Sequence, residues 1–268
     1  IYPMMVTVVV NLLNIVGNYT LIFGKLGMPA LGVEGAAIST SIARGVSMVI
    51  LAIILFRKHI PRFPLRLFRP FPWVELKNLL KIGLPAAGEE ISYSGSQVVI
   101  TFFINMLGNE ALATRTYCWN MIFLVYIFSI AMGQGGAILI GHLVGERKVH
   151  AAYLLGCYTR RLAILVSVAL SVVLALLGRY GLEWLTDNDE IIRTGCIILW
   201  IDVALEIGRA INIWATQALR ATGDVNYQFY VGITVQWLVS VGLSYLLGIH
   251  WGYGLLGMWV SFMLDENI

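Results

Sequence analysis

The sequence has 268 residues, of which 59% are hydrophobic and only 12% are charged, and its formal net charge is +3. A soluble domain has about 25% charged residues. This composition, with a mean hydropathy of +0.80, excludes a water-soluble globular domain, because too few charged side chains are present to cover its surface. Cys118, Cys157 and Cys196 form no CxxC pair, which favours free thiols.

Eight apolar segments follow one another along the chain, and a transmembrane helix needs about 20 such residues. The segments cover residues 2–23, 34–56, 79–106, 114–140, 158–178, 191–215, 226–248 and 254 to the end, the last being too short to cross a bilayer. The predicted fold class is therefore an all-α membrane protein.

The positions of lysine and arginine predict the orientation of these helices. If Ile1 is cytoplasmic, the inner loops hold twelve basic residues and the outer loops four, while the outer loop around 183–190 is acidic. Because basic residues accumulate on the cytoplasmic side, this orientation is favoured over its opposite.

The basic stretch 57–78 contains four of the seven prolines. We interpret it as a cytoplasmic linker between two lobes, the alternative being an ordinary connecting loop. Residues 1–56 would then be the last two helices of an N-terminal lobe. Residues 79–268 would be a C-terminal lobe of six helices, the last of them truncated.

An internal repeat supports two lobes. When residues 2–32 are shifted by 225 positions they meet 227–257, and the matched pairs include Tyr2/Tyr227, Gly17/Gly242, Gly27/Gly252 and Gly32/Gly257. Both copies run from inside to outside, so the repeat is parallel, and parallel repeats place the substrate between the two halves. The offset predicts an intact protein of twelve helices, about four of which would precede Ile1.

The first segment carries Thr7, Asn11, Asn14 and Asn18 on one helical face. Two interpretations remain open, hydrogen bonding between helices and the lining of a polar cavity.

The third segment places Glu89 and Glu90 after Pro85, near mid-depth. Glu90 shares a face with Tyr93 and Gln97, whereas Glu89 shares the neighbouring face with Ser92 and Ser96. Ionisable residues inside a membrane are functional candidates, and the alternative is a structural pair bound to a buried arginine.

The sixth segment places Asp202, Glu206 and Arg209 on one face, followed by Asn212. We expect Glu206 to pair with Arg209 at three-residue spacing, which would leave Asp202 without a local cation. Burial disfavours a charged carboxylate, so such an acid can take up and release protons, or it can help to coordinate sodium.

Enzyme motifs of the types G-x-S-x-G, H-E-x-x-H and G-x-x-x-x-G-K-[ST] are absent from the sequence. We therefore expect no catalytic residues, no protein-bound metal and no cofactor. Without an ATP site, transport would have to be driven by an ion gradient.

Several stretches resemble the multidrug and toxin extrusion (MATE) family. Residues 14–37 resemble its fifth helix, outer loop and sixth helix, and Gly83-Leu84-Pro85 resembles the opening of its seventh. Gly133-Gln134 and Gly141–Glu146 resemble the close of helix eight, and Leu219–Asp224 resembles the Leu-Arg-x-x-Gly-Asp turn before helix eleven. The resemblance implies that the chain is about the last 60% of a MATE transporter.

The resemblance also implies a function. Two six-helix lobes would surround a central cavity and export cationic amphipathic drugs or metabolites against entering H⁺ or Na⁺. Coupling acids in helices seven and ten correspond to Glu89 or Glu90 and to Asp202 or Glu206, and Asp202 with Glu90 is the preferred pair. This chain has Tyr93 where better-known members carry the acid of helix seven. The expected substrate cavity includes Asn11, Asn14, Tyr93, Gln97, Arg209 and Asn212.

The expected partners are a small-molecule substrate and the lipid bilayer of the plasma membrane, with no nucleic acid, and the expected state is a monomer. A polysaccharide or lipid-linked sugar flippase of the same wider fold group is the alternative, because Arg44, Arg115 and Arg209 could bind a phosphate. A membrane-embedded enzyme is a remote alternative.

The predicted orientation can be tested by labelling. Single cysteines introduced at 59–70 and 146–150 should react with a membrane-impermeant thiol reagent only from the cytoplasm, and those at 183–190 only from outside, because of the charge asymmetry. Labelling of 183–190 from the cytoplasmic side would overturn the orientation and the helix count together.

Overall fold

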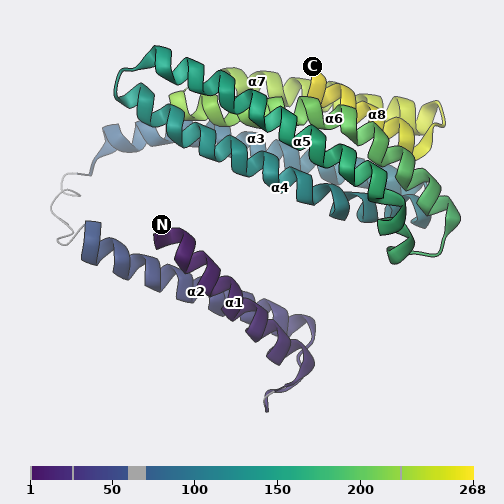
Figure 1. Cartoon of the computed structure of the whole chain (residues 1–268), viewed down its shortest axis with the longest axis horizontal. Helices are drawn as coiled ribbons and strands as arrows, with labels where there is room; N and C mark the ends of the chain where they lie inside the picture. Colours follow the sequence, from purple (N-terminus) through teal and green to yellow (C-terminus); the bar gives the residue numbers. More distant parts are fainter. Residues whose placement is uncertain (1, 26, 60–70, 224) are drawn as a thin grey trace. The chain divides into compact units, whose positions relative to one another are not determined.

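A computed structural model describes residues 2–25, 27–59, 71–223 and 225–268 (Figure 1). The chain forms two compact units, Ile1–Trp73 and Val74–Ile268. Eight α-helices occupy the described residues, and they correspond in order to the eight apolar segments. The predicted all-α fold is confirmed.

Unit 1 is a helical hairpin. Helix α1 spans Tyr2–Phe23, and α2 spans Val33–Ile54 and continues as the π-helical turn η1, Leu55–His59. The two helices approach closely because small residues face each other: a Cβ added to Gly17 would lie 3.3 Å from the Ser39 Cβ. The small cluster of Val6, Val10 and Ala43 forms the apolar centre of the hairpin.

Unit 2 contains the remaining helices. They are α3 (Trp73–Met106), α4 (Asn109–Gly145), α5 (Val149–Leu185), α6 (Asp189–Thr222), α7 (Asn226–Val235), the π-helical η3 (Gln236–His250) that continues α7, and α8 (Gly254–Asn267). Helix α3 begins at Trp73 rather than at 79, so the end of the predicted linker is helical. Linker residues 57–59 lie in η1, and 60–70 lie outside the described residues.

Five of the described helical stretches are long and apolar enough to cross a membrane by themselves, those of α1, α2 with η1, α4, α5, and α7 with η3. Helices α3 and α6 are each 34 residues long but carry charged side chains within the helix, and α8 has only 14 residues. These two long helices therefore have polar faces that other helices must cover.

The face that α5 buries in unit 2 is built mostly from small side chains. The buried face of α5 consists of Ala152, Gly156, Thr159, Ala163, Ser167, Ser171, Ala175, Gly178 and Leu182, spaced three or four residues apart. Small residues let the backbones of membrane helices approach, which maximises van der Waals contact where the hydrophobic effect is weak. Large apolar side chains such as Leu165 and Leu176 are instead exposed on the outer face, as expected for contact with lipid.

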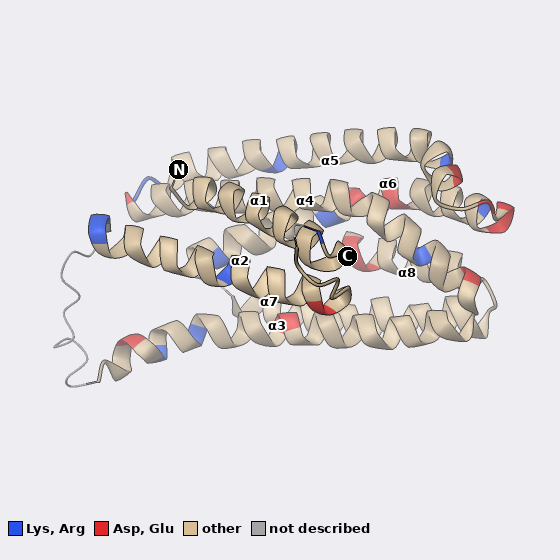
Figure 2. Ribbon diagram, turned by 90° about the horizontal axis from the view of Figure 1, so that it is seen from below, with Lys and Arg blue, Asp and Glu red and all other residues tan. Residues whose placement is uncertain are grey.

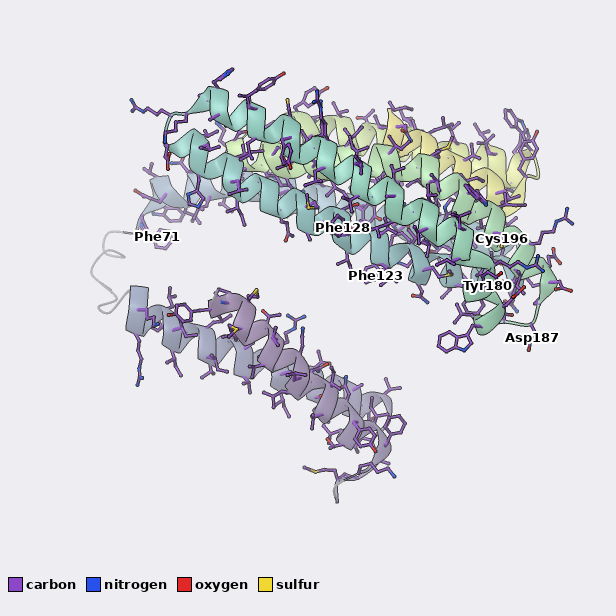
Figure 3. All side chains as sticks on the ribbon, in the orientation of Figure 1. Phe71, Phe123, Phe128, Tyr180, Asp187 and Cys196 are labelled. Carbon is purple, nitrogen blue, oxygen red and sulfur yellow. The ribbon has the colours of Figure 1, made fainter. Side chains whose placement is uncertain are left out.

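Charged residues collect at both ends of unit 2 and on α6 and α8, while most of α5 carries none (Figure 2). Tyr180, Asp187 and Cys196 lie at the end where α5 passes into α6 (Figure 3). Helix α6 starts there because the Asn188 side chain accepts hydrogen bonds from the backbone N–H groups of Glu190 and Ile191.

The internal repeat has a structural counterpart in the connections after α1 and η3. The matched glycines Gly27 and Gly252 have φ angles of 80° and 74°. Gly27 lies in the connection after α1, which ends at Phe23, and Gly252 lies just after η3, which ends at His250. Both have the positive φ that glycine adopts without strain, so the two connections share a glycine of the same conformation.

Helices α6 and α8 approach most closely at Gly208. A Cβ added there would lie 2.2 Å from the Glu266 carbonyl oxygen and 2.5 Å from its carbon. Since these are backbone atoms, only a movement of one helix could relieve the clash. The absence of a side chain at this position therefore fixes the spacing between the two helices.

We expect Gly208→Ala to lower the free energy of unfolding by about 1–3 kcal/mol through overpacking. Thermal unfolding of the purified full-length protein in detergent measures the change. Gly232→Ala on α7 is the matched control, because its added Cβ would meet nothing within 4 Å. Equal melting temperatures for the two variants would contradict the close approach.

Candidate functional site

The polar face of α6 forms a buried ionic cluster. The side chains of Asp202 and Glu206 are fully buried, and Arg209 is 7% exposed. Arg209 Nη1 lies 2.8 Å from Glu206 Oε2, which confirms the predicted pair. The i, i+3 spacing on one helix brings the two side chains together.

Asp202 differs from its prediction. Arg209 Nη2 lies 3.5 Å from Asp202 Oδ1, so this acid does have a local cation, because the long guanidinium spans both carboxylates on its helix face. Its second oxygen, Oδ2, has no hydrogen-bonding partner among the described residues, and neither has the indole nitrogen of Trp259 on α8. The carboxylate and the indole lie near enough to interact electrostatically but are not aligned as a proper hydrogen bond.

Glu206 is anchored to two further helices. Its Oε1 accepts a hydrogen bond of 2.8 Å from Ser129 Oγ on α4, and Ser129 and Ser167 of α5 are joined by a hydrogen bond of 2.7 Å between their hydroxyl oxygens. Both carboxylate oxygens of Glu206 are therefore engaged, and its geometry is set by α4, α5 and α6 together.

Helix α8 supplies a third carboxylate that the sequence analysis did not select. Glu266 Oε1 lies 3.7 Å from Arg209 Nε, and its Oε2 accepts a hydrogen bond of 3.0 Å from the Asn212 amide. The signal was present in the sequence, since Asp265 and Glu266 follow an apolar run. The rule that pointed to Glu89 and Glu90 applies to them equally.

A cavity of about 60 Å³ adjoins the cluster. Its walls come from α3, α4, α6, η3 and α8, and they include Arg209, Glu266 and Asp265. Tyr93 and Gln97, two residues expected to line the substrate cavity, are part of the wall, and Trp119, Tyr126, Trp259 and Phe262 make it largely aromatic. The face of α3 that carries Tyr93 and Gln97 and the polar face of α6 therefore line the same cavity.

Glu89 belongs to a different group of side chains. Its Oε2 accepts a hydrogen bond of 3.1 Å from Arg220 Nη2 near the end of α6, and its Oε1 accepts one of 2.6 Å from Gln228 Nε2 near the start of α7. The alternative of a structural pair bound to a buried arginine is met in part, because Glu89 binds an arginine but Arg220 is partly exposed. Ser92 and Ser96, on the same face of α3 as Glu89, accept hydrogen bonds from side chains of η3.

The other predicted residues are placed as follows. Glu90 is exposed within unit 2. In unit 1, Asn11 is exposed and Asn14 Nδ2 donates to Thr40 Oγ1 on α2 over 3.3 Å. Hydrogen bonding between helices therefore accounts for Asn14, and a cavity role for Asn11 and Asn14 stays a prediction.

Comparison with known proteins gives the family. The MatE family model matches residues 85–246. The chain belongs to the MATE family. It is 37% identical over 263 residues to the uncharacterized transporter YisQ of Bacillus subtilis, covering 98% of this chain and 58% of that protein. It is 27% identical over 267 residues to a probable multidrug resistance protein NorM of Thermotoga maritima, covering 98% of this chain and 56% of that protein.

Solved MATE structures share the fold. An outward-facing multidrug resistance MATE family transporter superposes with a TM-score of 0.85 at 22% identity, over 98% of this chain and 58% of that one. A MOP superfamily transporter from Pyrococcus furiosus, described by the reversed polarity of its binding pocket, gives 0.86 at 22% identity, over 98% of this chain and 59% of that one. This chain therefore spans somewhat over half the length of its relatives. As a member of the MATE family, the chain belongs to a multi-pass transporter of the cell membrane and not to an enzyme.

Glu206→Gln should destabilise the protein by roughly 3 kcal/mol, because it removes the shortest ion pair of the buried Arg209 and leaves only the longer contacts with Asp202 and Glu266. The melting temperature of the full-length protein measures this. Glu183→Gln is the matched control: Glu183 pairs with Arg179 at the same 2.8 Å, but both side chains are exposed, and exposed pairs contribute little. Equal changes in melting temperature for the two variants would show that burial does not strengthen the Glu206–Arg209 pair.

Proposed function

We propose that the full-length protein is a secondary antiporter that exports small molecules in exchange for entering H⁺ or Na⁺, and that the cluster around Arg209 couples the two fluxes. The observation that carries this proposal is an imbalance of charge. Asp202 and Glu206, both buried, and Glu266, partly exposed, surround one guanidinium, so three ionised carboxylates would leave a net charge of −2 in the cluster.

Such an imbalance favours the uptake of a cation. In a low-dielectric site neighbouring carboxylates cannot all stay ionised, and a proton or a bound Na⁺ removes the excess charge. Asp202 is best suited to this exchange, because its Oδ2 is unpaired and its contact with Arg209 is the longer of the two on α6. Glu206, held by Arg209 and Ser129, has both oxygens occupied.

The cluster also joins separate helices, so its charge state can bias their packing. Arg209 of α6 contacts Glu266 of α8, and Glu206 contacts Ser129 of α4. A cation that binds one arrangement of these helices better than another shifts the population toward it. Alternating access of the adjoining cavity would follow from that shift.

The relatives support export rather than lipid flipping. NorM of Thermotoga maritima is named a probable multidrug resistance protein and YisQ a transporter, so the flippase alternative is not favoured. The cationic group of an amphipathic drug or metabolite suits a cavity whose wall contains Asp265, Glu266 and aromatic side chains, since cations bind to aromatic faces as well as to carboxylates.

Asp202→Asn should abolish gradient-driven export while the protein still folds, because asparagine keeps the shape of the side chain and loses the titrating group. The measurement is substrate flux in proteoliposomes of the full-length protein, with an imposed pH gradient or sodium gradient in separate runs. The run that drives wild-type export identifies the coupling ion.

The control for this experiment is Asp187→Asn, which makes the same chemical change at an exposed position. It should export at the wild-type rate. If Asp202→Asn also exports at that rate with the same ion dependence, the coupling role of Asp202 is refuted and the acid is structural.

A further inference from the structure

The cavity of unit 2 contains a second arginine whose surroundings differ from those of Arg209. Arg115 of α4 forms a short hydrogen bond from Nη1 to Thr101 Oγ1, and its Nη2 donates to Gln97 Oε1 over 3.0 Å. Both acceptors lie on α3 and both are neutral. Within the part of the chain that the structure describes, Arg115 has no ion pair with a carboxylate.

Arg115 lies in the second turn of α4 and is only partly buried. Its guanidinium stays ionised and has five N–H donors, of which Thr101 and Gln97 engage only two. These contacts fix the direction of the group without neutralising it. The remaining donors of Arg115, which is part of the cavity wall, can therefore serve an anionic ligand.

The side chains around Arg115 indicate which kind of molecule would carry this anionic group. Trp119 and Tyr126 of α4 lie in the same wall, with ring centroids 5.9 Å apart, and Tyr93 lies within the electrostatic reach of both Arg115 and Arg209. A planar aromatic group can stack on these rings. The cavity, at about 60 Å³, is large enough for a small charged group but not for a whole drug-sized molecule.

We propose that Arg115 is a specificity-determining residue that binds a carboxylate carried by the aromatic substrate. The guanidinium fork fits a carboxylate with two parallel N–H···O hydrogen bonds, which a point charge cannot do. The inference deepens the proposed function, on which it rests, by requiring an anionic group on a substrate that is also cationic.

The test compares two probes that differ only at the carboxylate, rhodamine 110 and its methyl ester rhodamine 123. Equilibrium binding to the purified full-length protein is measured by fluorescence anisotropy with no gradient imposed. Wild type should bind the acid at least about tenfold more tightly than the ester, since charge-assisted hydrogen bonds are lost on esterification.

Arg115→Gln should abolish this preference by weakening binding of the acid about tenfold or more, because the donor fork and its charge are lost. Arg115→Lys keeps the charge without the fork and should retain part of the preference, which keeps the proposal testable if the glutamine variant does not fold. Arg179→Gln, at an exposed arginine, is the control and should retain the full preference.

Two outcomes would overturn the carboxylate site: equal binding of both probes by wild type, or an unchanged preference in Arg115→Gln. The second would mean that another part of the full-length protein neutralises Arg115. Failure of the antiporter proposal is a different result, in which neither gradient drives flux of any probe although the binding preference is present.

Discussion

The structure of unit 2 depends on one arginine placed among carboxylates in a medium that cannot solvate it. Arg209 contacts Asp202, Glu206 and Glu266 at 3.5, 2.8 and 3.7 Å. Removing an ion from water costs several kcal/mol even after relaxation, and only close partners offset it. The helices that carry those partners must therefore remain packed, and the weaker contacts of Asp202 and Glu266 are the ones free to change when a cation enters.

The small residues of the core make this arrangement possible. Gly208 lets α8 approach α6 until its backbone is in contact, and Ser129 and Ser167 carry a hydroxyl bridge from Glu206 through α4 to α5. Where lipid replaces water outside the bundle, burial of apolar surface contributes little to helix association. Packing and polar contacts therefore have to hold the helices together, and the ionic cluster around Arg209 is among those contacts.

Glu89 and Asp202 are both acids within helices, but they belong to different groups of side chains. Glu89 is bound by Arg220 and Gln228 where α6 ends and α7 begins, whereas Asp202 lies in the cluster beside the cavity. A carboxylate with one cation and one amide donor is well compensated and suited to joining helices. Carboxylates that outnumber their cation are suited to exchange. We therefore propose that this difference in the ratio of carboxylates to cations, rather than burial alone, separates the structural acid Glu89 from the acids of the Arg209 cluster.

The sequence by itself determined the helices, the hydrophobic class and the Glu206–Arg209 pair, because helix periodicity and i, i+3 spacing are local properties. It also placed Glu89, Ser92 and Ser96 on a different face from Tyr93 and Gln97, and the structure keeps those faces apart. Only the tertiary structure decided that Glu266 joins Arg209, that Arg220 takes Glu89, and that Arg115 enters the cavity without an acid. The first two contacts join residues 57 and 131 positions apart, and the third depends on which helix faces α4. No local pattern encodes the distance between two helices, which approach closely only where a glycine leaves room for it.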